Sequence, residues 1–455
     1  MAEFNDMPNE VLEHIFSFLH LNTRCNLALV CQRWNAVLLS DRFLNRNVVL
    51  HLNGRRLLTK QPIRRNYRNF SISMEPSLLT PECIKSVRMI PSVVPSPTHV
   101  ELHYAALNDV NFMAIYTEQL IDFRTVETLF LFGTMSKYLV KLPITPKEHR
   151  VQFVTDRLHT LNLNVGVIEN VRFVAPNLRH LHLAVHTKEH LNFLLEFMDQ
   201  LHTLIIKFFS KEVFYFYTLS LGNLRHLSID RWEKAMTKSE QSISIGFFKR
   251  CKRLERLEMF FKFVDSFVLH SIAANLRQLV ELTLVVQEGT IQLWHISTLP
   301  VLKHLRITAR HVYLHNLQLP ALQSLRIGSK KGARLEGIEC LMAFTRLRTL
   351  TLVNVKLYPE VQQLTPTYSV ERMVLAHYDK LEDNHLLVLV KRFPALRWLH
   401  IKRCHGIDQR EIDKLKRMHP KLAVAYDVPS PVALWNDGVE DRKSHEVDYT
   451  FKPRK

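Results

Sequence analysis

The residues of this chain with the clearest potential for catalysis form the run His186-Thr187-Lys188-Glu189-His190. In the order H-x-x-E-H, two histidines on one helix can bind zinc together with a distant carboxylate, while the glutamate activates a zinc-bound water. Here the run directly follows a predicted strand, at the turn into a helix, where polar side chains are usually exposed. We therefore interpret it as an exposed helix start and predict no metal site.

Other patterns that support catalysis are missing from the sequence. The six cysteines, at positions 25, 31, 83, 251, 340 and 404, have no paired spacing, which argues against a disulfide framework or a zinc site. Eleven glycines in 455 residues leave little room for a glycine-rich phosphate loop, and the sequence contains no nucleophile elbow. We expect a protein that is not an enzyme, with no catalytic residue and no cofactor.

A short apolar motif recurs along most of the chain and predicts the elements that position its other residues. Clear copies read Leu-x-x-Leu-x-Leu, as at Leu178–Leu183 and Leu347–Leu352, and we name the last apolar residue of each copy its anchor. Thirteen anchors span 299 residues, or about 25 residues per repeat. They are Leu102, Leu131, Leu163, Leu183, Ile206, Ile229, Met259, Leu284, Ile307, Ile327, Leu352, Leu375 and Ile401.

This motif is the signature of leucine-rich repeats, in which each unit supplies one strand, one turn and one helix. No unit can bury its apolar face alone, so neighbouring units must stack into a solenoid. The expected fold class is therefore α/β, a curved parallel sheet with outer helices over residues 48 to 427. Strands near Val48 to Leu52 and Phe70 to Met74 begin the array, and Leu422 to Tyr426 closes it. Residues 428 to 455 predict a tail that is partly disordered or packed across the last repeat.

The residues that precede the repeats predict three helices. Asp6 can cap the first helix, with Pro8 in its first turn, and Asn22 or Thr23 can cap the second. Their apolar residues are Val11, Leu12, Ile15, Phe16 and Leu19 in the first, Leu27 and Val30 in the second, and Trp34, Val37 and Leu38 in the third, Gln32 to Leu39. Because about 45 residues provide little core, we expect a partner to complete some of this apolar surface.

Three segments of this region resemble an F-box, a short three-helix module. They are Met7-Pro8-Asn9-Glu10-Val11-Leu12, Ile15-Phe16-Ser17-Phe18-Leu19 and Val30-Cys31-Gln32-Arg33-Trp34, at the separations typical of that family. The resemblance covers about one tenth of the chain, residues 1 to 47, and implies that the matching positions bind a small Skp-type adaptor. These positions are Pro8, Ile15, Leu19, Val30 and Trp34, with Phe16 and Cys31 in support. Alternatively, Phe16 and Cys31 belong to the core alone.

The last full repeat also resembles the cysteine-containing leucine-rich repeats common in F-box receptors. It carries Cys404 and Ile407 after the anchor Ile401. Asp408 and Glu411 have the spacing of a capping box, which predicts a helix from Gln409 to Met418.

The F-box resemblance implies a substrate receptor of an SCF-type E3 ubiquitin ligase. Such a receptor reaches the cullin and the RING subunit through the Skp-type adaptor, and its solenoid holds a client protein near a charged conjugating enzyme. Two alternatives remain open: a leucine-rich-repeat scaffold that binds the adaptor without ubiquitin ligase activity, and a basic scaffold that binds nucleic acid. An enzyme built around residues 186 to 190 comes last.

The formal net charge of +18 is unevenly distributed along the chain. Residues 42 to 74 hold eight Lys or Arg and no acid, and residues 391 to 421 hold ten bases against three acids. The first stretch predicts a basic patch of Arg55, Arg56, Lys60, Arg64, Arg65 and Arg68. It is either the solvated face of a scaffold or a surface for an acidic or phosphorylated client; no nucleic-acid module accompanies it.

Three histidines are candidates for client binding because they occupy variable strand positions that should point to the concave face. They are His180, His182 and His226. The sequence shows no secretory signal and no run of eighteen uncharged apolar residues. We therefore expect a protein of the cytoplasm, the nucleus or both, without membrane contact.

Overall fold

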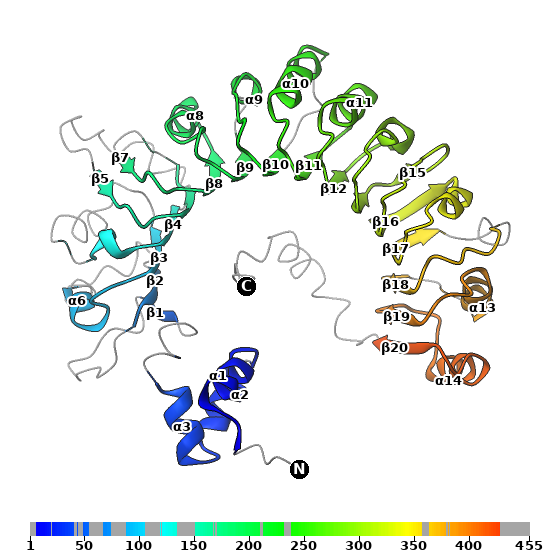
Figure 1. Cartoon of the computed structure of the whole chain (residues 1–455), viewed down its shortest axis with the longest axis horizontal. Helices are drawn as coiled ribbons and strands as arrows, with labels where there is room; N and C mark the ends of the chain where they lie inside the picture. The colour runs from blue at the N-terminus through cyan, green and yellow to red at the C-terminus, as the bar shows by residue number, and fades with distance from the viewer. Residues whose placement is uncertain are drawn as a thin grey trace. The chain divides into compact units, whose positions relative to one another are not determined.

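Figure 1 shows the computed structural model of the chain, in which strands and helices alternate along most of its length. The structure describes residues 6–19, 21–40, 43, 49–53, 67–73, 88–104, 119, 121–133, 151–166, 168, 171–209, 213–231, 238–356, 364–378, 381 and 383–427. The chain divides into two compact units, Met1–Leu224 and Arg225–Lys455. The predicted tail, residues 428 to 455, lies outside the described residues.

The first unit begins with three helices and continues as a parallel sheet. The helices are α1 (Asn9–Ser17), α2 (Leu21–Ala28) and α3 (Gln32–Leu38). The sheet consists of β1 (Val49–Asn53), β2 (Asn69–Ser73), β3 (His99–Tyr104), β4 (Thr128–Gly133), β6 (Thr160–Asn164), β8 (His180–Val185) and β9 (Thr203–Phe208). A separate parallel pair joins β5 (Val151–Val154) to β7 (Val171–Val174). The remaining helical segments are α6 (Ile90–Val93), η3 (Phe123–Thr125), α8 (Lys188–Leu195) and α9 (Val213–Phe216).

The second unit repeats the same arrangement, with several longer helices and two longer strands, β16 and β17, whose bounds follow. Its parallel sheet contains β10 (His226–Arg231), β11 (Arg256–Phe261), β12 (Glu281–Val286), β14 (His304–Thr308), β16 (Ser324–Glu336), β17 (Thr349–Lys356), β18 (Arg372–Ala376), β19 (Trp398–Lys402) and β20 (Ala423–Asp427). The helices are α10 (Lys238–Arg250), α11 (Ser266–Asn275), η5 (Leu293–Ile296), η6 (Ile338–Ala343), α13 (Asp383–Arg392) and α14 (Gln409–Met418). Two short strands, β13 (Thr290–Gln292) and β15 (His311–Tyr313), complete it.

The predicted anchors form the core of both units. In the first unit, the register aligns Leu102, Leu131, Leu163, Leu183 and Ile206 in one row, which Leu52 and Ile72 extend at its start. In the second unit, it aligns Ile229, Met259, Leu284, Ile307, Ile327, Leu352, Leu375 and Ile401, followed by Tyr426. Each of the thirteen anchors is at most 2% exposed. Full burial of such a side chain contributes about 1.5–3 kcal/mol, and the repeat prediction is confirmed.

Among the described residues, the helices between the strands of each unit lie on one face of its sheet. Figure 1 shows α10, α11, α13 and α14 on the same side of the strands of the second unit. Because side chains alternate along a strand, residues next to an anchor project to the other side, which we name the open face. In β19, for example, Leu399 and Ile401 are buried, whereas Trp398, His400 and Lys402 retain exposed surface.

The sequence predicts one outer helix in each repeat, but some repeats of the second unit have no α-helix in their described outer layer. Between β12 and β17 it consists of η5, η6 and the short strands β13 and β15. A second row of buried residues forms there, because Ile291, Val312 and Leu335 are aligned in register. The anchors Ile307 and Ile327 are separated by twenty residues, the short end of the range for this repeat class. In this repeat, the short strand β15 and turns take the place of the helix.

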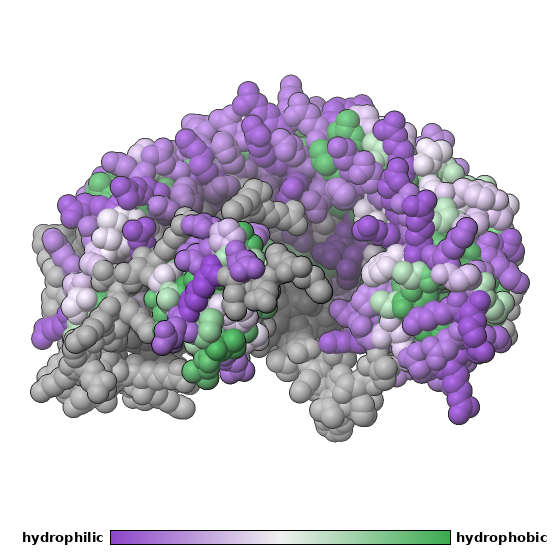
Figure 2. Space-filling model, turned by 60° about the horizontal axis from the view of Figure 1, so that its bottom comes forward, coloured by the Kyte–Doolittle hydropathy of each residue, from purple (hydrophilic) through white to green (hydrophobic). Residues whose placement is uncertain are grey.

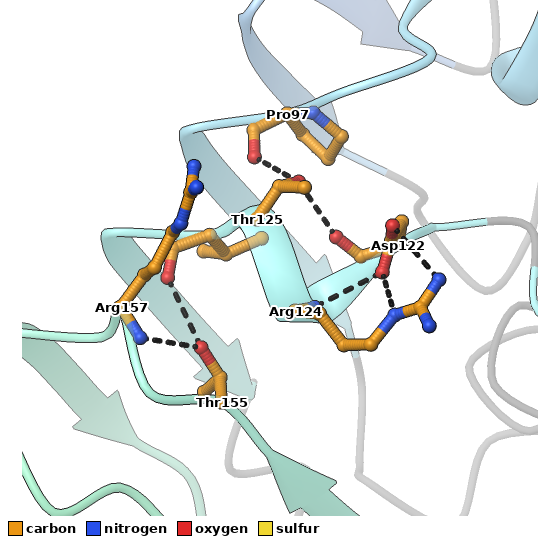
Figure 3. Close-up of polar contacts among 7 residues, drawn as sticks. Pro97, Asp122, Arg124, Thr125, Thr155 and Arg157 are labelled. Carbon is orange, nitrogen blue, oxygen red and sulfur yellow. Dashed lines mark hydrogen bonds and ion pairs between the residues drawn. The ribbon is translucent and has the colours of Figure 1, made fainter.

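Polar side chains in the loops of the first unit connect neighbouring repeats (Figure 3). The hydroxyl of Thr125 donates to the carbonyl of Pro97 at 2.7 Å and lies 2.9 Å from the carbonyl of Asp122. One repeat further on, the hydroxyl of Thr155 donates to the carbonyl of Val126 at 3.4 Å. The backbone carbonyls of one loop are thus satisfied by side chains of the loop that follows.

The predicted capping box is present at the start of α14. The Asp408 carboxylate accepts a hydrogen bond from the Glu411 N–H at 2.9 Å, and the Glu411 carboxylate accepts one from the Asp408 N–H at 3.0 Å. The helix has the predicted bounds and buries Ile412 and Leu415. The cap therefore fixes the start of a helix that contacts β20, the last described strand of the second unit.

We expect Asp408→Ala to lower the free energy of unfolding by about 1 kcal/mol, because the N–H groups at the start of α14 lose their carboxylate partner. Asp413→Ala in the same helix is the matched control, since it removes a hydrogen bond from Gln409 four residues earlier, worth about 0.3 kcal/mol. Urea denaturation followed by circular dichroism measures both. Equal losses would contradict the capping role of Asp408.

Candidate adaptor-binding site

The three N-terminal helices enclose a very small core. Within the described residues it consists of Leu12, Phe16, Val37, Leu38 and Phe43. Phe16 is 1% exposed, and its ring meets Trp34 edge-on with 5.4 Å between the ring centres. Phe16 therefore stabilises the core from which Trp34 projects and offers no surface of its own to a partner. This burial agrees with the core interpretation of that residue.

The helix starts differ from those expected from the sequence. Pro8, and not Asp6, is the N-cap residue of α1, and no side chain caps this helix. Helix α2 already begins at Leu21, so the expected caps Asn22 and Thr23 lie inside the helix. It also ends at Ala28, so Val30 lies in the turn that follows it and not in the helix.

Cys31 has a structural role that the sequence pattern did not reveal. It is the N-cap residue of α3, and its sulfur accepts a hydrogen bond from the Trp34 N–H at 3.4 Å. Sulfur is a weak acceptor, so this is a modest cap. It nevertheless places the indole of Trp34 at the first turn of α3.

Two arginines that sequence reasoning missed hold the helices together. Arg33 donates to the side-chain oxygen of Asn9 at 3.0 and 3.1 Å and to the backbone carbonyl of Met7. Arg24 donates to the carbonyls of Leu19 at 2.8 Å and Ser17 at 3.0 Å, the end of α1. Burial lowers the pKa of Arg24, whose charge complements the carbonyl end of the helix.

The predicted contact residues differ in how much surface they expose. Pro8 is exposed and Val30 is 60% exposed, whereas Ile15, Leu19 and Trp34 are half-buried against the small core. Cys31 is half-buried as well. The structure thus brings Ile15, Leu19 and Trp34 together around one core, and the assignment of these residues to a partner contact stays a prediction.

Further apolar residues of this module are exposed and were not among the predicted contacts. Leu29 is 84% exposed and Phe18 is 68% exposed, with Val11 and Leu39 less so. The exposure of these two residues could have been predicted from the sequence. Leu29 directly precedes Val30 at the end of the second helix, and Phe18 lies outside the apolar stripe of the first helix. Figure 2 shows a described surface that is mostly hydrophilic, with apolar residues in a few patches. Exposed apolar patches of this kind mark protein interaction sites.

The three candidate histidines occupy strand positions as predicted. His180 and His182 flank the buried Leu181 in β8, and His226 begins β10 in the other unit. All three are half-buried, and burial lowers the pKa of His180. Their role in client binding stays a prediction.

A different polar cluster on the open face of the first unit is better defined. Glu101 lies between His99, at 3.0 Å, and His103, at 3.8 Å, all on β3. Burial raises the pKa of Glu101, but hydrogen bonds from His103, His99 and Ser71 outweigh it and hold this pKa well below the usual range. The alternation His-x-Glu-x-His on one strand was the sequence signal for this cluster.

The basic patch lies largely outside the described residues, which exclude Arg55, Arg56, Lys60, Arg64 and Arg65. Arg68 is described and exposed. Its backbone carbonyl accepts hydrogen bonds from Thr98 at 2.8 Å and His99 at 3.2 Å, which fixes its position beside β3.

The H-x-x-E-H run starts α8 as predicted, but its second histidine is not exposed. His190 is fully buried, and its Nε2 donates to the carbonyl of Val165 at 2.8 Å while Nδ1 lies 3.0 Å from the Thr187 hydroxyl. The side chain therefore joins α8 to the preceding repeat, which explains why it turns inward. Across the described residues, no group of three or more His, Cys, Asp or Glu has the arrangement of a metal site.

The first histidine of the run, His186, stacks on Phe209 with 4.6 Å between ring centres. Both of its ring nitrogens are buried without a hydrogen-bond partner. Burial, with a smaller contribution from His190, lowers the pKa of His186 to about 4. The neutral ring is the form that fits this site.

No helix in the described part of the chain combines the length and apolar character needed to cross a membrane.

Comparison with known protein families matches residues 4–51 to the family described as F-box-like. The N-terminal module is an F-box-like domain. The match ends four residues beyond residue 47, the boundary expected from the sequence. A comparison with curated proteins finds no match.

Solved structures similar to the chain include TLR13 in a TLR13–ssRNA13 complex, with a TM-score of 0.52, 14% sequence identity, and coverage of 85% of this chain and 53% of that chain. The chain thus spans about half the length of TLR13 in that structure. An internalin, InlF, from Listeria monocytogenes has a TM-score of 0.38 at 15% identity, with coverage of 67% and 80%. The yeast Rad7 and Elc1 complex has a TM-score of 0.39 at 15% identity, with coverage of 91% and 92%.

The similarity to TLR13 shows the fold alone. Together with the aligned anchors, it confirms the predicted fold class, an F-box-like domain followed by an α/β solenoid of leucine-rich-repeat type.

We expect the stability of the protein to fall as the pH drops from about 6.5 to about 4, in part because of His186. Its folded-state pKa is about 4, below the unfolded value of about 6.5, so the unfolded state binds more protons within this window. His186→Phe preserves the ring stacked on Phe209 and should reduce the loss by about 1 kcal/mol, a figure discounted for partial exposure. Urea denaturation at pH 7 and pH 4 provides the comparison. An unchanged pH dependence in the variant would count against this role of His186.

Proposed function

We propose that the chain is a substrate receptor of an SCF-type E3 ubiquitin ligase. In this role the F-box-like domain binds a Skp-type adaptor, and through it the cullin and the RING subunit, while the solenoid binds a client protein. The observation that carries the proposal is the exposed apolar surface of a domain whose family is F-box-like and whose described core is very small.

The exposed residues account for the binding energy that such a contact requires. Val30 and its neighbour Leu29 lie in the turn between α2 and α3 and are 60% and 84% exposed. Full burial of each side chain under a partner would contribute about 1.5–3 kcal/mol. Ile15, Leu19 and Trp34 are half-buried, so a partner would complete their burial. The residues matched by the resemblance thus have the exposure that the proposed contact needs.

The proposed catalysis is proximity. A receptor that binds the ligase with one domain and the client with another raises the effective concentration of the client lysine near the conjugating enzyme. The chain itself would act without a catalytic residue, a cofactor or a metal. A receptor of this kind acts in the cytoplasm, the nucleus or both.

The scaffold that binds the adaptor without ubiquitin ligase activity is the alternative that shares most of these features. It requires the same apolar contact and differs in the recruitment of the cullin. A nucleic-acid-binding scaffold would instead lose affinity steeply as salt rises.

We expect Val30→Asp to weaken binding of a purified Skp-type adaptor at least about tenfold, because a carboxylate would be buried in an apolar contact. Val30 lies outside the core, so the fold should be unaffected. Isothermal titration calorimetry with the full chain measures the affinity, and circular dichroism verifies the fold.

Val301→Asp is the matched control, since Val301 is a partly exposed valine of a loop in the second unit. It should bind the adaptor as the native chain does. Absence of adaptor binding by a folded native chain would overturn the proposal. Adaptor binding without co-purification of the cullin would favour the scaffold.

A further inference from the structure

The sheet edge at which the strands of the second unit begin is strongly basic. The strands β10, β11, β12, β14, β16, β17, β18, β19 and β20 are mutually parallel, so the residues that directly precede them lie at one edge of the sheet. The four residues before each of these strands include, in total, nine Lys or Arg and two acids. We name the nine bases the basic edge: Arg225, Lys252, Arg253, Arg277, Lys303, Arg346, Arg348, Arg397 and Lys421.

Backbone hydrogen bonds hold the segments of the basic edge side by side. The residue directly before one strand donates its N–H to the carbonyl of the equivalent residue before the neighbouring strand. Two examples are Arg348 to Gln323 at 2.9 Å and Arg397 to Glu371 at 2.8 Å. Neighbouring segments are therefore about 4.8 Å apart, the spacing of the strands themselves. The sheet thus arranges the cations of the basic edge in a line that crosses the strands.

The two acids at this edge are each paired with an arginine. Glu255 lies 3.6 Å from Arg225, and Glu371 pairs with Arg348. Arg277 donates to the backbone carbonyl of Thr298 at 2.8 Å, which leaves its charge without a carboxylate partner in that bond. Five further cations are exposed and form no ion pair with any residue that the structure describes. They are Lys252, Lys303, Arg346, Arg397 and Lys421.

An exposed aromatic ring lies among these cations. Tyr368 is 73% exposed and belongs to the segment that enters β18. The neighbouring segments, which enter β17 and β19, carry Arg346 and Arg397. On either side of the tyrosine in sequence, Thr367 and Val370 are buried, so the core holds the segment while the ring faces solvent. The basic edge thus combines a line of cations with a ring that is available for stacking.

We propose that the basic edge binds single-stranded nucleic acid, with its cations on the phosphates and Tyr368 stacked on a base. A line of cations that recurs from repeat to repeat fits a polymer with regularly spaced negative charges, which the phosphate backbone is. An exposed aromatic ring adds a platform for an unpaired base, which a duplex keeps inside its stack. This function is additional to the proposed receptor role and independent of it, because these residues lie outside the F-box-like domain.

The test uses the full chain with fluorescein-labelled twelve-nucleotide oligouridine and oligothymidine. Fluorescence anisotropy measures the affinity from about 50 to 200 mM NaCl, and binding by the native chain should weaken as salt rises. Lys303→Gln combined with Arg397→Gln should lower the affinity several-fold. It should also reduce the slope of log affinity against log salt by about 1.4, because each phosphate contact to a single strand contributes about 0.7.

A second variant tests stacking separately from charge. Tyr368→Ala should lower the affinity at least about fivefold and leave the salt slope unchanged, because stacking releases no counterions. Tyr368→Phe preserves the ring and should bind as the native chain does. A general attraction of polyanions to a basic protein would not distinguish these two variants. Circular dichroism verifies that each variant is folded.

The matched control is Arg310→Gln combined with Lys356→Gln, which removes two exposed cations at the opposite edge of the same sheet, after β14 and at the end of β17. Its affinity and salt slope should stay close to the native values. Similar affinity for the two oligonucleotides, or a preference for either, would sustain the inference. No binding by the native chain, equal loss in the control, an unchanged affinity of Tyr368→Ala, or tighter binding of a duplex or of a twelve-residue polyglutamate would each overturn it.

Discussion

The structure depends on the burial of one apolar anchor per repeat against the anchors of the repeats before and after it. A single Leu-x-x-Leu-x-Leu segment exposes this side chain to water and has no stable fold alone. The parallel register that aligns Leu284 with Met259 and Ile307 removes each anchor from water and also pairs the backbone of each strand. Sheet position, loop placement and the direction of every other strand side chain follow from this alignment.

The anchors could be predicted from the sequence because their burial requires an apolar residue at a fixed offset. The outer layer could not, since a helix such as α11, a 3₁₀ turn such as η5 and a strand such as β15 all cover the same apolar row. The sequence also did not predict which residues have a left-handed backbone conformation. Asn354 lies within β17, whereas His377 and Arg403 directly follow β18 and β19; their φ angles are 49°, 58° and 49°. Side chains of three different kinds thus adopt the left-handed conformation.

The N-terminal site was predictable in its residue types and less so in its geometry. The apolar periodicity of α1 identified Leu12 and Phe16, which are indeed buried. It did not reveal that Cys31 caps α3 or that Arg33 joins α3 to the start of α1, because both depend on contacts between helices. Similarly, His190 was expected to be exposed, but the carbonyl of Val165 one repeat earlier provides a buried partner for its ring.

The alternation of buried and projecting residues along each strand has a consequence for how recognition is encoded. Read across the strands of the second unit, one row of the open face is Ser228, Glu258, Thr283, Arg306, Arg326, Thr351, Val374 and His400. Neighbours in this row are twenty or more residues apart in the chain, so no linear peptide contains the surface. A residue of this row can be substituted during evolution without disturbing the buried residues beside it in the strand. A one-residue shift of register within a strand would instead move its buried residues to the open face and its open-face residues into the core.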